Sequence, residues 1–157
     1  MSLAQDNKSI IRNLLEEIDR GNLEVVDQYY SPHYIDHNPI AIPNLPSGME
    51  GVKQAFRVLQ LAFPDASHVI EDIVAEGDKV VARVSARGTH QGNLFGLAAT
   101  GKEVSMTGIA IYRLADGKIT ERWAEQSTSI LQQTWNKPIT RVCHPKPTNM
   151  SKKRIRQ

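Results

Sequence analysis

The spacing of apolar residues changes once along the chain, and this change constrains the fold more than any other feature. Before Pro64, apolar residues recur three and four positions apart, which predicts amphipathic helices. After Pro64 they alternate with polar residues, which predicts strands. Because helices come first and long strands follow, we expect an α+β fold. It would be a cone-shaped, curved antiparallel sheet, with the N-terminal helices covering its concave face and enclosing a cavity.

Turn and capping residues place the elements along the chain. A first helix is predicted from a cap at Asp6 or Asn7 to Gly21, and a shorter second helix ends at Ser31-Pro32. A third helix is predicted over 49–63, and a short strand over 33–37. The four long strands, with tight turns between the first two and the last two, are predicted at 69–75, 79–90, 103–114 and 118–127.

Length and charge indicate one domain over 1–135 and a basic, disordered tail over 136–157. Seven of the 19 basic residues follow Trp135, with no Asp or Glu among them. The remainder has 12 basic residues against 17 acidic ones, a net charge of −5. The basic pI therefore reflects the tail, and we expect no nucleic-acid partner for the folded domain.

No apolar run approaches the roughly 20 residues that span a membrane, so we expect no membrane partner. The N-terminus lacks a signal-peptide pattern, and Cys143 is the single cysteine of the chain. An intramolecular disulfide is therefore excluded. These observations favour the cytoplasm.

The stretch from Lys118 to Ser127 is the first candidate for a functional strand. Strict alternation would place one set of residues on a single face: Ile119, Glu121, Trp123, Glu125 and Ser127. Two carboxylates beside an indole are unusual on a plain core strand. Either this face lines a pocket, or Trp123 packs in the core and the glutamates lie at its edge in water.

Other side chains suited to a ligand site are scattered along the chain. His90 either donates to a substrate carbonyl or organises the glycine-rich loop that follows it. Asp36 and His37 are adjacent on a strand, so only one of them can face a cavity. Met106 and Tyr112 share a strand face whose direction the sequence leaves open, while Tyr34 and Phe63 either bind an aromatic ligand or belong to the core.

Several short motifs occur in a characteristic order. They include Tyr34-x-Asp36-His37-x-Pro39, Ala62-Phe63-Pro64-Asp65, Gly88-Thr89-His90-Gln91-Gly92 and Asp116-Gly117-Lys118-Ile119-x-Glu121-x-Trp123. Together they resemble the SnoaL-like polyketide (ester) cyclase family of the nuclear transport factor two-like superfamily, from about Leu14 to Gln133. The resemblance implies a cone-shaped α+β barrel, usually a homo-oligomer (a dimer or tetramer), and a cofactor-free, aldol-type ring closure.

The resemblance also implies a base on the last strand, an aspartate four residues after the tryptophan. That position is Ser127 here, or Gln126 if the strand is one residue shorter, and neither side chain is a base. Glu125 is the first substitute, because burial beside Trp123 would raise the pKa of its carboxyl group toward neutrality. Asp36 or His37 is the second.

Three functions follow from these residues. The first is a cyclase or isomerase acting on a hydrophobic, polyketide-like carbonyl compound, with Glu125, Glu121 and His90 in catalysis. In it the substrate is bound by Trp123, Asp36, His37, Tyr34, Phe63, Met106, Tyr112 and Ser127. The second is a non-catalytic small-molecule binding or dimerisation module. The third is an epoxide or ester hydrolase in the same cavity. We expect no cofactor and no metal, since no metal-ligating motif and no phosphate-binding glycine loop occurs.

Overall fold

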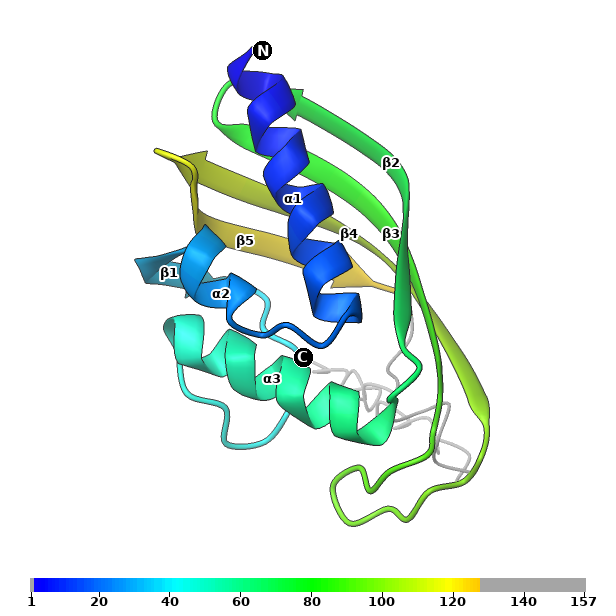
Figure 1. Ribbon diagram of the computed structural model, residues 1–157. Helices are drawn as coiled ribbons and strands as arrows, with labels where there is room; N and C mark the ends of the chain where they lie inside the picture. The colour runs from blue at the N-terminus through cyan, green and yellow to red at the C-terminus, as the bar shows by residue number, and fades with distance from the viewer. Residues whose placement is uncertain (1, 128–157) are drawn as a thin grey trace, which may run out of the picture.

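The computed structural model describes residues 2–127, which form three helices and one five-stranded sheet, with the first strand between the second and third helices (Figure 1). The helices are α1 (Leu3–Asp19), α2 (Val25–Tyr29) and α3 (Gly48–Ala62). The strands are β1 (Tyr30–Asp36), β2 (Ser67–Glu76), β3 (Lys79–Thr89), β4 (Glu103–Ala115) and β5 (Lys118–Gln126). The predicted tail over 136–157 lies outside the described residues.

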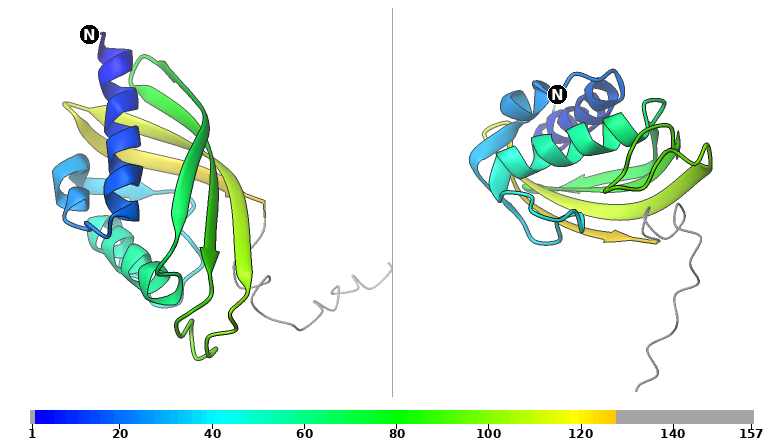
Figure 2. Two further views of the ribbon diagram at one scale, coloured as in Figure 1. Left: turned by 45° about the vertical axis from the view of Figure 1, so that its right-hand side comes forward. Right: turned by 90° about the horizontal axis from the view of Figure 1, so that it is seen from below.

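The strands form one sheet in the order β1-β5-β4-β3-β2. Neighbouring strands from β5 to β2 are antiparallel, whereas β1 pairs with β5 in parallel, which strand periodicity did not reveal. The sheet curves around the helices, which all lie on its concave side (Figure 2). The predicted α+β fold is confirmed.

The main core lies between α1 and the sheet. Ile11, Leu14 and Ile18 of α1 are buried and pack against Val80 and Ala82 of β3, within a larger buried cluster. Fully burying each such aliphatic side chain contributes about 1.5–3 kcal/mol relative to leaving it in water. This packing holds α1 across the concave face and fixes the helical side of the cavity.

The first helix begins one turn earlier than predicted. Ser2 caps it, because its hydroxyl oxygen accepts a hydrogen bond from the backbone N–H of Gln5 (3.3 Å). Asn7, one of the two predicted caps, is instead buried inside the helix. The end matches the prediction, since Gly21 has a φ of +84°, a backbone conformation that favours glycine.

A bulge near the start of β5 changes which side chains share a face. Arg113 pairs with Glu121, but Leu114 pairs with Ile119, so Thr120 has no partner of its own in the ladder. The Thr120 hydroxyl donates to the backbone carbonyl of Arg113 (3.2 Å). Beyond the bulge the alternation is shifted by one residue. The prediction that Ile119 shares a face with Glu121 and Trp123 is therefore wrong.

The concave face continues after the bulge through Arg122 and Ala124, which pair with the inward-facing Tyr112 and Ala110 of β4. Ile119, before the bulge, is fully buried in the core. The outer face carries Glu121, Trp123 and Ser127, whereas Glu125, near the end of the strand, also borders the cavity.

Candidate functional site

A cavity of about 1010 Å³ lies between the concave face of the sheet, α1, α3 and the loop over 37–47. Its floor comes from β3 and β4, where Ala82, Gly108 and Ala110 are small and leave room for a ligand. Met106 and Tyr112 lie on the same strand face, which settles the direction that the sequence left open. The helical side is mainly apolar, with Leu14, Met49, Val52, Ala55, Phe56 and Leu59.

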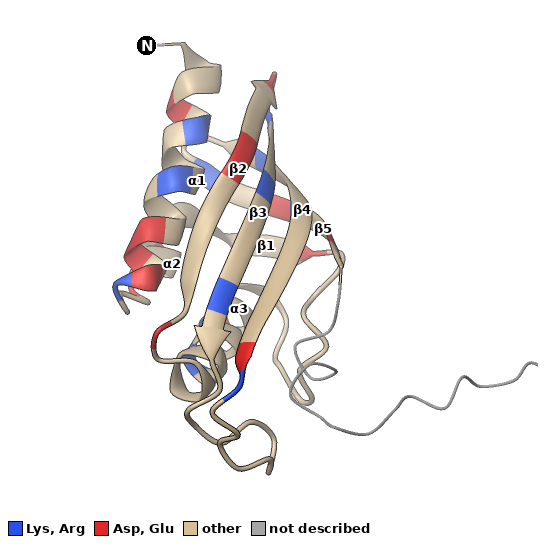
Figure 3. Ribbon diagram, turned by 90° about the vertical axis from the view of Figure 1, so that its right-hand side faces the viewer, with Lys and Arg blue, Asp and Glu red and all other residues tan. Residues whose placement is uncertain are grey.

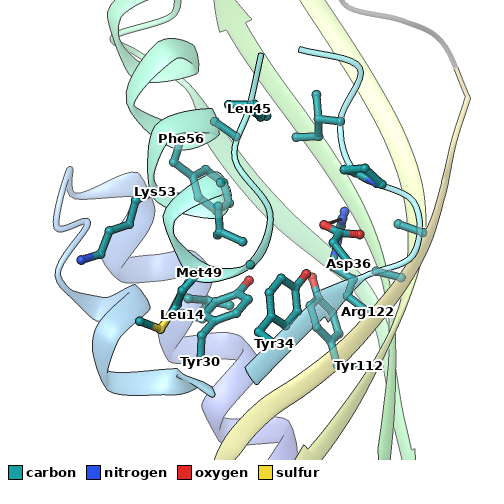
Figure 4. A pocket seen from close by; sticks show the side chains of 18 of the residues that line it. Leu14, Tyr30, Tyr34, Asp36, Leu45, Met49, Lys53, Phe56, Tyr112 and Arg122 are labelled. Carbon is teal, nitrogen blue, oxygen red and sulfur yellow. Dashed lines mark hydrogen bonds and ion pairs between the residues drawn. The ribbon is translucent and has the colours of Figure 1, made fainter. Parts of the chain in front are cut away.

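One end of the cavity holds a buried ion pair (Figure 4). Arg122 Nη1 donates to Asp36 Oδ2 at 3.0 Å, and their side chains are only 15% and 17% exposed. The parallel pairing of β1 with β5 places the two residues directly opposite each other. The remaining Asp36 oxygen, Oδ1, accepts from the backbone N–H of Asn38 (3.1 Å). The carboxylate is therefore fixed by charge and by the turn that ends β1.

Tyrosines surround this ion pair. The rings of Tyr30 and Tyr34 meet edge to face at 4.7 Å, and both residues are buried. Figure 4 shows the hydroxyl groups of Tyr34 and Tyr112 pointing toward Asp36 and Arg122. Burial raises the pKa of Tyr30 and of Tyr34 well above the ordinary value of 10.0, so both phenols stay protonated. They are thus hydrogen-bond donors in an apolar setting.

The charge of Arg122 is retained in this environment. Burial by itself favours the neutral guanidine, but neighbouring Tyr112 and Asp36 favour the cation, and the pKa of Arg122 is raised overall. We call Asp36, Arg122, Tyr34 and Tyr112 the tyrosine–arginine cluster. The sequence pointed to Asp36, Tyr34 and Tyr112 but not to Arg122, because the bulge that turns Arg122 inward has no clear sequence signal.

Glu121 and Trp123 lie on the outer face of the sheet and do not line the cavity. The ring of His37 stacks on Trp123 at 4.5 Å between centroids and 3° between planes. His37 Nε2 lies 2.9 Å from Glu121 Oε2, and Arg113 pairs with the other oxygen of Glu121. These contacts, with His37 first and Arg113 next, lower the pKa of the Glu121 carboxyl group. Of the adjacent pair, Asp36 therefore faces the cavity and His37 faces away.

The end of β5 offers a different environment from the one expected for a base. Glu125 borders the cavity but is exposed to solvent. Ser127 Oγ accepts hydrogen bonds from the Thr107 hydroxyl (2.8 Å) and the Thr107 backbone N–H (3.2 Å). Ser127 is thus engaged in closing the strand pair, while the catalytic role assigned to Glu125 stays a prediction.

His90 and Phe63 belong to a second, smaller core beside the loop over 91–101. His90 is fully buried and lines neither described cavity. Its Nδ1 lies 2.9 Å from the Thr100 hydroxyl and accepts from the Thr100 backbone N–H (3.2 Å). This geometry agrees with the alternative in which His90 organises the loop that follows it. The structure does not bring His90 close to Glu121 or Glu125. Phe63 is buried against Leu94 and Val104 and borders a smaller hollow between α1, α3 and the sheet.

Residues 2–127 offer neither a metal-binding group nor a membrane-spanning helix. Within this range no group of three or more His, Cys, Asp and Glu side chains could hold a metal ion. No helix in the same range is both long enough and apolar enough to cross a membrane.

The curved sheet, the helices on its concave side and the cavity between them define a small α+β ligand-binding domain. The chain belongs to the SnoaL-like polyketide cyclase family, whose model matches residues 9–134. It is 30% identical over 150 residues to aklanonic acid methyl ester cyclase DauD of Streptomyces sp. (strain C5), covering 88% of this chain and 89% of the relative.

Two further comparisons agree with this family. Aklanonic acid methyl ester cyclase DnrD of Streptomyces peucetius is 33% identical over 116 residues, covering 71% of this chain and 78% of DnrD. The solved structure of TsrD from Streptomyces laurentii superposes with a TM-score of 0.73 at 27% identity, covering 85% of this chain and 97% of TsrD.

Proposed function

We propose that this protein is a cofactor-free cyclase that closes a ring in a polyketide-like carbonyl compound by an intramolecular aldol-type reaction. The observation that carries the proposal is the large apolar cavity ending in the tyrosine–arginine cluster. Family membership and two relatives named as methyl ester cyclases support the reaction class. An ester of an aromatic polyketide is therefore the proposed substrate class.

The cluster has the chemistry to bind oxygen atoms of such a substrate. The hydroxyl groups of Tyr34 and Tyr112 and the guanidinium of Arg122 are donors, and a polyketide presents carbonyl and phenol oxygens as acceptors. Hydrogen bonds from these largely buried donors orient the substrate, which favours reaction between two parts of one molecule. Met106 and the small floor residues would contact its rings.

Ring closure also needs a base, and two carboxylates border the cavity. Asp36 forms an ion pair with Arg122, whereas Glu125 is exposed to solvent. Glu125 is the base that the sequence predicts. Comparing Glu125→Gln with Asp36→Asn tests it, because a base at Glu125 predicts that only the first substitution abolishes turnover while substrate still binds.

The test uses the full chain and aklanonic acid methyl ester, the compound in the names of two relatives. A cyclase gives a product of unchanged mass and altered chromatographic retention, since ring closure is an isomerisation. Tyr34→Phe should weaken substrate binding or turnover at least severalfold, and Leu61→Phe, an exposed position on α3, should change neither. If the wild-type protein binds the ester but does not convert it, the non-catalytic binding module is favoured. A product heavier by one water molecule would favour a hydrolase.

We also propose that two copies of the chain associate through the outer face of the sheet. Val74, Val81, Ile111 and Trp123 follow one another in register across β2, β3, β4 and β5. Val74 is 62% exposed, so the row includes an apolar side chain in contact with solvent. Figure 3 shows both acidic and basic residues along the long strands, and the ion pairs Asp72–Arg83 and Arg113–Glu121 flank the row. Light scattering should give twice the mass of the 17.5 kDa chain, and Val74→Lys should reduce it to one chain. The cytoplasm stays the proposed compartment.

A further inference from the structure

A second polar group faces the cavity, at the other edge of the sheet. Asp19, the last residue of α1, holds His68, the second residue of β2. His68 Nδ1 lies 2.6 Å from Asp19 Oδ1, and the His68 backbone N–H donates to Asp19 Oδ2 (2.8 Å). Because a carboxylate only accepts hydrogen bonds, the proton of a neutral His68 ring resides on Nδ1. The other nitrogen, Nε2, then carries the free lone pair.

The surroundings of His68 suit a proton acceptor. His68 pairs with Ala86, and Ala86 pairs with Met106, so the three side chains lie side by side on the concave face. His68 borders both the main cavity and the adjoining, largely apolar hollow of about 300 Å³ between α1, α3 and the sheet. The pair is partly shielded, with side chains 19% and 24% exposed, and Nε2 has no hydrogen-bond partner among residues 2–127.

The position of His68 also specifies the shape of the ligand. Met106 and Tyr112 are six residues apart on β4, which corresponds to roughly 20 Å along the strand. The row that contains His68 is therefore far from the tyrosine–arginine cluster. A ligand that contacts both must be elongated, as a chain of fused rings is.

We propose that the Asp19–His68 pair is the general base of the ring closure, with His68 as the catalytic residue and Asp19 as the positioning residue. This inference rests on the proposed function. His68 Nε2 takes a proton from a carbon that lies between two carbonyl groups, and the C–H electron pair becomes that of an enolate. The enolate carbon attacks a carbonyl carbon of the same molecule, forming the C–C bond. The carbonyl π electrons move to oxygen, and the imidazolium returns its proton to that alkoxide.

The ring closure requires no further reactant, because substrate and product contain the same atoms and the protein returns to its starting protonation state. Asp19 stabilises the imidazolium that forms in between and keeps Nε2 aimed at the cavity. The tyrosine–arginine cluster fixes the far end of the molecule during the reaction.

The experiment separates proton abstraction from ring closure. The full chain in D₂O is mixed with a naphthoylacetate methyl ester, which has the acidic carbon but cannot cyclise, and proton loss at that carbon is followed by NMR above the buffer rate. Wild type should accelerate exchange, and His68→Asn should reduce the acceleration by at least about 100-fold. Asp72→Asn, an exposed carboxylate on the same strand, is the matched control and should match wild type.

A second readout tests the role of Asp19. Asp19→Asn should lose part of the exchange activity, Asp19→Glu should restore some of it, and ring ¹⁵N shifts should show that Asp19→Asn alters the ratio of the two His68 tautomers. Equal exchange by His68→Asn and wild type, or no exchange by wild type, would overturn the inference. Cyclisation of aklanonic acid methyl ester by wild type would still uphold the proposed function in either case.

Discussion

Asp36 and Arg122 face each other across the only parallel strand pair among the described residues, and their side chains form a 3.0 Å ion pair at the end of the cavity. The pair depends on two features: the parallel register of β1 with β5, and the bulge that turns Arg122 inward. It joins the start of the sheet to its last strand. The same ion pair therefore stabilises the fold and fixes the position of two side chains of the tyrosine–arginine cluster.

Removing one partner of this pair should destabilise the fold. Asp36→Asn leaves the Arg122 charge largely buried without a counterion, at a cost of about 3 kcal/mol in the free energy of unfolding. Urea denaturation measures the change. Asp72→Asn removes an exposed partner of Arg83 and should cost less than about 1 kcal/mol. Similar losses for the two variants would show that burial does not distinguish the pairs.

The buried tyrosines should resist ionisation. Two of the four tyrosines, Tyr30 and Tyr34, have pKa values raised by burial, so ultraviolet absorbance should show incomplete phenol ionisation until the protein unfolds. In the unfolded chain they lose protons near pH 10, and stability should therefore fall as the pH rises above 10. Tyr34→Phe should lessen that fall. A full four-tyrosine transition in the folded protein would contradict the prediction.

The outer-face carboxylate should contribute to stability in the opposite pH range. The pKa of Glu121 is lowered by its hydrogen bonds to His37 and Arg113, so its contribution is present above the ordinary value of 4.5. It should disappear as the pH falls below 4.5 through the lower, folded-state pKa. Thermal unfolding of wild type and Glu121→Gln should therefore differ at pH 6 and converge toward pH 3. A constant difference would mean that protonation of Glu121 is not involved.

Filling the cavity floor should prevent ligand uptake. Ala110 is buried on β4 and lines the cavity, so Ala110→Phe would occupy space that a ligand needs. Binding of a fluorescent naphthalene dye should weaken at least about tenfold, while circular dichroism remains that of the wild type. Leu61→Phe adds the same ring at an exposed position and should bind the dye normally. Unchanged binding by Ala110→Phe would place the dye elsewhere.

Local patterns in the sequence were enough for much of the fold. Apolar spacing identified the helices and strands, because each amphipathic face follows directly from the geometry of its element. Motif order identified the family, and the motif Tyr34-x-Asp36 by itself marked two members of the cluster. The ends of single elements were predicted less accurately, since Ser2 caps α1 in place of the predicted Asp6 or Asn7.

Only the tertiary structure decided which side chains share the cavity. One unpaired residue, Thr120, exchanges the faces of β5, so Arg122 turns inward and Trp123 stacks on His37 outside. His68 and Asp19 are 49 positions apart and meet only because α1 ends beside the start of β2. Alternation along a strand predicts two faces, but which face is buried depends on register with neighbouring strands. That register is set by contacts between distant segments, so the sequence determined the fold class, and packing determined the site.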